Sequence, residues 1–110
     1  MEALSRQIFE YIAPSGSNPF REWLDGLSDR KAQALIDVRI ANVRRGTFGD
    51  CKPLGHGVFE LKLSYGPGYR IYIAMDGGAV VLLLCGGSKK SQSRDIQRAY
   101  QYLEDYRKRK

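Results

Sequence analysis

Cysteine and histidine are scarce in this chain of 110 residues, which contains two cysteines and one histidine. Two cysteines are too few for a disulfide framework, and with a single histidine they leave too few ligands for a tetrahedral zinc site. Cys85 ends an apolar segment and is expected to be a small core residue, whereas Cys51 is expected in a loop. The sequence therefore predicts a protein of a reducing compartment that uses no metal and no other cofactor.

Long apolar segments are also missing. No segment approaches the roughly 20 residues that a membrane-spanning helix needs, and the N-terminus lacks the apolar core of a signal peptide. We therefore expect a cytoplasmic protein without membrane contact. Apolar residues still make up 43% of the chain, so its length predicts a single domain, residues 1–110, with one core.

Acidic residues are outnumbered by basic ones. The chain has 12 Asp and Glu against 18 Lys and Arg, which gives a formal net charge of +6 at pH 7. Such a charge on a small domain favours polyanionic partners such as nucleic acids. A basic surface that serves solubility, or one that complements an acidic protein, explains the same count, so these alternatives stay open.

Two segments in the second half of the chain have the alternating pattern of strands. Residues 58–63 and 69–75 alternate with a period of two, so each has one apolar face and one polar face. Glu60 and Lys62 share the polar face of the first segment, and Arg70 lies on that of the second. If the two strands pair, one face of the sheet is apolar and the other is an open polar face that carries cations.

A third, wholly apolar segment ends close to further cations. Residues 79–85 lead through Gly-Gly-Ser to Lys89 and Lys90, and a helix is expected to begin at Ser91 or Ser93. Backbone N–H groups at a helix N-terminus favour anions. These lysines and the polar face together predict a surface that holds phosphates.

The first half of the chain predicts one strand and two helices. Residues 6–12 alternate weakly as a strand, and Asn18 followed by proline is typical of the start of a short helix. Ser28 is expected to cap a longer helix that ends at Gly46, and residues 47–57 are expected to form a loop. The order β-α-α-β-β-β-α predicts an α+β domain with one curved, mostly antiparallel four-stranded sheet, two N-terminal helices and a C-terminal helix.

Several motifs follow one another in a specific order. They are Leu54-Gly55-His56-Gly57, Val58-Phe59-Glu60-Leu61-Lys62, Gly68-Tyr69-Arg70-Ile71-Tyr72, the segment from Leu82 to Gln92, and Arg94-Asp95-Ile96. Their order and spacing resemble the RelE/ParE superfamily of toxins from bacterial type II toxin–antitoxin modules, and most closely its HigB-like, addiction-module-killer branch. The resemblance spans nearly the whole chain and implies a RelE-like fold.

The resemblance also implies a function and a partner. Superfamily toxins act until a cognate antitoxin neutralises them, here expected to be a small helix-turn-helix protein encoded beside the toxin. Many members cleave mRNA in the ribosomal A site, so the expected activity is a ribosome-dependent endoribonuclease that inhibits translation through metal-free 2'-OH attack. The ParE branch instead inhibits DNA gyrase without catalysis, and a degenerate toxin fold that only binds RNA is a further alternative.

Six residues are expected to act in cleavage, namely Arg70, Lys62, Lys89, Lys90, Glu60 and His56. Arg70 offers a planar fork to phosphate oxygens, and Lys62 is a second phosphate contact, a base or an ordinary solvated cation. Glu60 is either a general base or, as we favour, the ion-pair partner that orients Arg70. His56 is a potential acid or base because its ordinary pKa lies near neutrality, although a lone loop histidine is more often a surface residue.

Five further residues are expected to contact RNA, namely Lys52, Tyr65, Tyr69, Tyr72 and Arg94. Tyr65 and Tyr69 offer rings on which a base can stack; alternatively, Tyr69 belongs to the core and Tyr65 is an exposed loop aromatic. Some cleaving relatives carry a Tyr or His near the C-terminus, whereas the corresponding region here, around Arg94, has neither. The general acid and base therefore stay unassigned.

Overall fold

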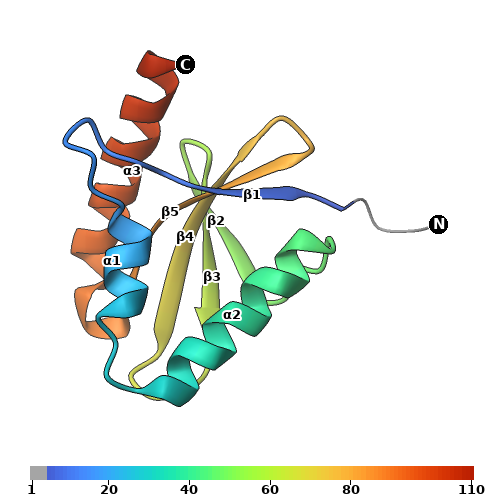
Figure 1. The fold of residues 1–110 in the computed structure, drawn as a ribbon, viewed down its shortest axis with the longest axis vertical. Coiled ribbons are helices and arrows are strands. Elements are labelled where there is room, and N and C mark those ends of the chain that lie inside the picture. The colour runs from blue at the N-terminus through green and yellow to red at the C-terminus, as the bar shows by residue number, and fades with distance from the viewer. Residues whose placement is uncertain (1–4) are drawn as a thin grey trace.

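A five-stranded sheet forms the centre of the protein, which a computed structural model describes for residues 5–110. The strands are β1 (Gln7–Glu10), β2 (Cys51–Gly55), β3 (Val58–Leu63), β4 (Tyr69–Asp76) and β5 (Val80–Ser88). They lie in the order β1-β5-β4-β3-β2 (Figure 1). Only the pairing of β1 with β5 is parallel. The predicted α+β class with a mostly antiparallel sheet is confirmed.

Three helices accompany the sheet. They are α1 (Pro19–Asp25), α2 (Arg30–Arg44) and α3 (Gln92–Arg109), the last preceded by a short 3₁₀ turn, η1 (Lys89–Ser91). Asn18 caps α1 as predicted, since its side chain accepts a hydrogen bond from Arg21 N at 3.0 Å. The predicted cap of α2 is wrong: Asp29, not Ser28, holds that place, and its carboxylate accepts hydrogen bonds from two backbone N–H groups of the first turn.

Strand β2 occupies part of the segment that was expected to be a loop. Lys52 pairs with Glu60 of β3, and the register shifts between Pro53 and Gly55. A proline is tolerated there because β2 lies at the edge of the sheet, where a missing N–H breaks no ladder bond. Cys51 therefore begins a strand instead of lying in a loop, and the sheet has five strands where four were expected.

Helices lie on both faces of the sheet. On the face that was expected to be open and polar, Glu60, Arg70 and Tyr72 are buried, and only Lys62 of the predicted residues on β3 and β4 stays exposed. The core on one face combines α1 and α2 with side chains of β3, β4 and β5, and the core on the other face combines α3 with β4 and β5. Ile71 and Tyr72, neighbours on β4, are both fully buried although they point to opposite faces. Cys85 belongs to the core under α3 as predicted, and burial raises the pKa of its thiol to about 12.

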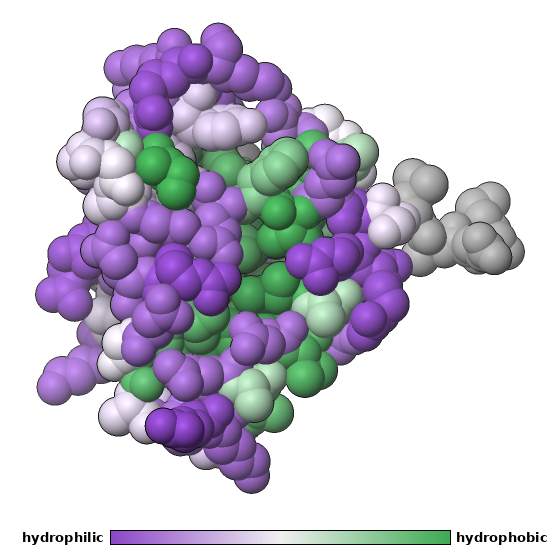
Figure 2. Space-filling view, in the orientation of Figure 1, coloured by the Kyte–Doolittle hydropathy of each residue, from purple (hydrophilic) through white to green (hydrophobic). Residues whose placement is uncertain are grey.

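Figure 2 shows the face of the molecule that carries α1 and α2. Apolar side chains gather in a hollow between the two helices, and polar side chains border it. The core beneath these helices includes partly buried residues, among them Leu27 and Leu35. We call this surface the apolar strip.

Two glycines of β5 allow helices to touch the backbone of the strand. A Cβ atom on Gly86 would lie 2.2 Å from the ring of Trp23, and one on Gly87 would lie 1.8 Å from Asp95 Oδ2. Trp23 of α1 and Asp95 of α3 thus lie directly on opposite faces of the same strand. This close approach fixes both helices relative to the end of β5.

We expect Gly87→Ala to lower the free energy of unfolding by about 1–3 kcal/mol, because the added methyl group forces Asp95 and the start of α3 to move. Urea denaturation followed by circular dichroism measures the change. Gly78→Ala is the matched control, since no atom lies within 4 Å of its Cβ position. Equal stabilities of the two variants would contradict the contact between Asp95 and β5.

None of the helices within residues 5–110 is both long enough and apolar enough to cross a bilayer. The same part of the chain brings no three His, Cys, Asp or Glu side chains into a group that would hold a metal ion.

Candidate phosphate-binding site

A buried ion pair joins β3 and β4 beneath the N-terminal end of α3. Arg70 Nε lies 3.8 Å from Glu60 Oε2, and each side chain is only 6% exposed. Arg70 Nη1 also donates a hydrogen bond to Gly68 O at 2.7 Å, and Gln92 Nε2 donates one to Glu60 Oε2 at 2.9 Å. Charges at this depth are stable only when they are paired. The pairing of Glu60 with Arg70, one of the two roles expected of Glu60, is therefore present, and it holds Arg70 in place.

Two buried donors face Glu60 without an acceptor at hydrogen-bond distance among the described residues. They are Arg70 Nε, whose contact with Glu60 is the 3.8 Å ion pair, and the hydroxyl of Tyr72. Burial, and then the negative charge of Glu60, raise the pKa of the Tyr72 hydroxyl, so it stays protonated at neutral pH. Unused buried donors are rare in folded proteins, and a site that acts on a ligand is one place where they occur.

Exposed lysines flank Arg70 on two sides. Lys62 is its cross-strand partner on β3. Lys89 lies beside the loop before β4, where its backbone N donates to Pro67 O. A Cβ atom on Gly68 would lie 3.1 Å from Arg70 Nη1 and 3.5 Å from Lys89 Cβ, so both cations adjoin the same loop residue. We call Lys62, Arg70 and Lys89 the cationic cluster.

Two further cations continue this surface onto α3. Lys90 and Arg94 are exposed and line a cavity of about 550 Å³ together with Ser88, Ser91 and Ser93. Ser91 Oγ donates a hydrogen bond to Asp95 Oδ2. The structure therefore places four of the predicted cations, Arg70, Lys89, Lys90 and Arg94, around the end of β5, and the fifth, Lys62, beside Arg70 on β3.

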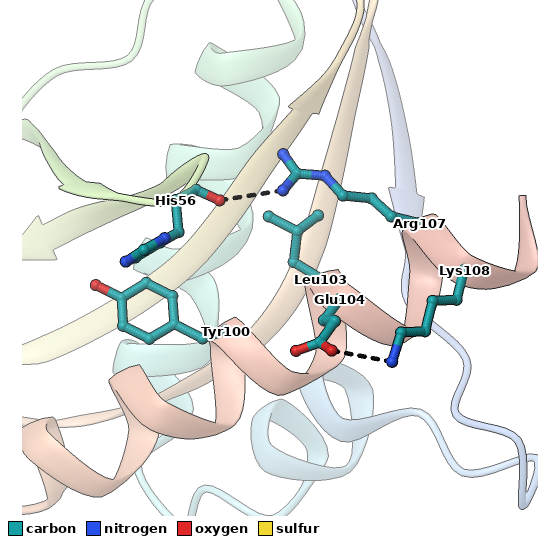
Figure 3. Close-up of a pocket in the computed structure, with 6 residues that line it drawn as sticks. All are labelled: His56, Tyr100, Leu103, Glu104, Arg107 and Lys108. Carbon is teal, nitrogen blue, oxygen red and sulfur yellow. Dashed lines mark hydrogen bonds and ion pairs between the residues drawn. The ribbon is translucent and has the colours of Figure 1, made fainter.

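His56 lies away from this cluster. It occupies the turn between β2 and β3, whereas Lys62 is near the other end of β3, about 13 Å or more along the strand. Its carbonyl accepts a hydrogen bond from Arg107 Nη1 at 3.2 Å, and its ring lies edge-on to Tyr100 (Figure 3). His56 lines a separate cavity of about 490 Å³ against α3. This placement contradicts a role for His56 as acid or base beside Arg70.

The residues expected to contact RNA have different surroundings. Tyr72 is fully buried, which contradicts its expected contact with RNA. Tyr65 is half-buried, and its hydroxyl donates to Asp29 Oδ2 at 2.9 Å. Lys52 is exposed on the edge strand β2, opposite Glu60. Tyr69 is 8% exposed but lines a groove beside β5.

Sequence reasoning missed the part that α3 plays in the site. Gln92 donates a hydrogen bond to Glu60, and the carboxylate of Asp95 packs against Gly87. The signal was the pair of glycines at the end of an apolar strand, because glycine inside a strand often marks the close approach of another segment.

Comparison with known proteins identifies a family that matches this chain. Residues 22–104 match the family model described as Phage derived protein Gp49-like (DUF891). An uncharacterized protein of Haemophilus influenzae is 44% identical over 80 residues, which cover 73% of this chain and 81% of that relative. The family match includes every residue of the cationic cluster.

Proposed function

The chain belongs to the Gp49-like family of phage-derived proteins, a family of the addiction-module-killer, RelE-like toxin type, and on that premise we propose that it is a HigB-like toxin that cleaves mRNA on the ribosome. The observation that carries this proposal is the cationic cluster, in which two exposed lysines flank a buried arginine. A toxin that only binds a protein target has no need of such a cluster. This is why we favour RNA cleavage over inhibition of gyrase.

The proposed reaction needs no metal. The 2'-hydroxyl of one ribose loses its proton and its oxygen attacks the adjacent phosphorus. The bond from phosphorus to the 5'-oxygen breaks and that oxygen takes up a proton, which leaves a 2',3'-cyclic phosphate and a 5'-hydroxyl with no net change in protons. Negative charge develops on the non-bridging oxygens, and fixed cations that face these oxygens stabilise the transition state. Lys62 and Lys89 supply exposed ammonium groups, and Arg70 supplies a guanidinium whose position Glu60 and Gly68 fix.

The antitoxin is the second partner that the family implies. We assign the apolar strip between α1 and α2 to it, because an exposed apolar hollow on a small protein is typical of a protein-binding surface (Figure 2). This surface lies over helices that contribute no residue to the cationic cluster. An antitoxin bound there leaves the cluster itself uncovered, so neutralisation acts by keeping the toxin out of the ribosome.

Induction of the protein without its antitoxin tests the proposal. We expect growth arrest, together with new 5' ends inside translated codons when total RNA is mapped by primer extension. The same message without a start codon is the control and should stay intact, because it never enters the ribosome. Growth arrest with intact messages and an induced DNA-damage response would contradict cleavage and favour gyrase as the target.

A further inference from the structure

A groove beside the free edge of β5 has the properties of a nucleotide site. It has a volume of about 410 Å³, within the range of roughly 300–1,000 Å³ that is typical of small-ligand sites. Its lining combines three aromatic rings with two cations: Trp23, Tyr69, Tyr102, Arg94 and Arg98. The groove lies between α1 and α3; it shares Leu27 with the apolar strip and no residue with the cationic cluster.

The aromatic rings are held in place from behind. Trp23 lies against the backbone of Gly86 and meets Tyr69 edge-on, with ring centroids 6.2 Å apart. Tyr102 stacks on Tyr11, with centroids 5.0 Å apart. Trp23 and Tyr102 are nevertheless only partly buried, so each leaves part of its ring open to the groove. Rings that are already ordered lose little entropy when they stack on a ligand.

The floor of the groove is the free edge of the last part of β5, whose other edge pairs with β4. β1 pairs with β5 only from Val80 to Leu83, and Tyr11 N donates the last bond to Leu83 O. Beyond that point no strand of residues 5–110 lies on this side of β5, and the segment from Cys85 to Ser88 lines the groove. An open strand edge presents backbone N–H and C=O groups, which suit the polar edge of a planar base.

The charges of the groove are arranged asymmetrically. Arg94 and Arg98 are exposed on α3, and the neighbouring cavity with Lys90 shares Arg94, Ser88 and Ser91 with the groove. Asp95 is the acidic group of the lining, but it is buried and its carboxylate accepts a hydrogen bond from Ser91 Oγ, so the exposed charges of the groove are positive. A phosphate is therefore favoured on the side of Arg94 and Lys90, and a base on the side of the rings.

We propose that this groove binds one unpaired nucleotide of the RNA substrate, with its base between Trp23 and Tyr102 and its phosphate against Arg94 and Lys90. The proposal rests on the proposed function, because it adds a specificity subsite to an RNA-cleaving toxin. Unstacked bases of single-stranded RNA bind by stacking on aromatic rings next to cations. The groove adjoins the cationic cluster, since Gly87 is the cross-strand partner of Arg70, so a nucleotide in it neighbours the phosphate that is cut.

Fluorescence of the protein tests the groove directly, because Trp23 is the single tryptophan of the chain. Titration of the purified protein with each of the four ribonucleoside 5'-monophosphates should quench Trp23 in a saturable way, with one base preferred. Ribose 5-phosphate, which has the phosphate but no base, should not quench it. The double variant Arg94→Ala, Arg98→Ala should bind at least about tenfold more weakly, as expected for the loss of one charge-assisted hydrogen bond.

A second double variant controls for charge alone. Arg44→Ala with Lys108→Ala removes two cations that do not line the groove and should leave the affinity unchanged. Absence of saturable quenching, equal quenching by ribose 5-phosphate, or equal affinities of the two double variants would each overturn the proposal. The titration contains no ribosome, so a negative result here leaves the mapping of cleaved messages as an independent test of the toxin activity.

Discussion

Arg70→Ala is expected to lower the free energy of unfolding by about 3–5 kcal/mol, because it leaves a buried carboxylate without its cation. Glu60 is 6% exposed at its side chain and has Arg70 as its ion-pair partner. The hydrogen bond from Gln92 remains in the variant but carries no charge. Urea denaturation monitored by far-ultraviolet circular dichroism measures the loss.

Two further variants show whether the loss comes from the unpaired charge. Replacing both partners, Glu60→Leu with Arg70→Met, should restore most of the stability, since apolar side chains of similar volume often substitute for a buried ion pair without cost. Lys62→Ala, which removes the exposed cross-strand neighbour of Arg70, should change the stability by less than about 0.5 kcal/mol. A double variant as unstable as Arg70→Ala would show that the ion pair is not the cause.

The same variants separate folding from chemistry. Loss of toxicity in Arg70→Ala alone is ambiguous, because an unfolded toxin is also inactive. The folded double variant lacks the guanidinium but keeps the shape of the site. Loss of toxicity in that variant assigns the Glu60–Arg70 pair to the reaction, and retained toxicity assigns both residues to folding only.

Lys62→Ala combined with Lys89→Ala is expected to slow cleavage of ribosome-bound mRNA by about 10²–10³-fold, because charge on the phosphorane loses two of the cations that face it. Both lysines are exposed, so the stability of the variant should stay within about 1 kcal/mol of the parent. The measurement is the rate at which 5'-labelled message is cut in a translation mixture of purified components.

The control for this variant removes the same charge elsewhere. Arg44→Ala with Lys108→Ala takes two cations from the end of α2 and the last turns of α3, far along the chain from the cationic cluster. Cleavage by this control should match that of the parent protein. If both double variants slow cleavage equally, general attraction to the ribosome, and not a local contact with phosphate, explains the effect.

Strands β3 and β4 were predictable from the sequence because each alternates polar and apolar residues over its length. The packing of α3 on their polar face was not predictable. Alternation shows that a strand has two faces, but it does not say what packs on each. The clue to burial on both sides was the continuous apolar character of residues 79–85, which is typical of a strand with helices on both faces.

The site was predictable in its residue types and only partly in its arrangement. Arg70, Lys62 and Lys89 do lie together, because strand register and a short loop set their positions. The burial of Arg70 was missed because it depends on α3, whose Gln92 contacts Glu60 of β3, 32 residues earlier in the chain. His56 was misplaced for the opposite reason, since its loop motif is adjacent to β3 in sequence but lies at the wrong end of the strand.

The parallel pairing of β1 with β5 has a consequence for synthesis of the chain. Gln7 pairs with Val80, so β1 has no partner strand until the ribosome has made the residues between them. Synthesis proceeds at about 5–20 residues per second. Asp95, which closes over Gly87, is made later still. Under the proposed function, the nascent toxin has no complete active site while α3 is inside the ribosome. The toxin is thus inactive until α3 has left the ribosome and has docked against β5.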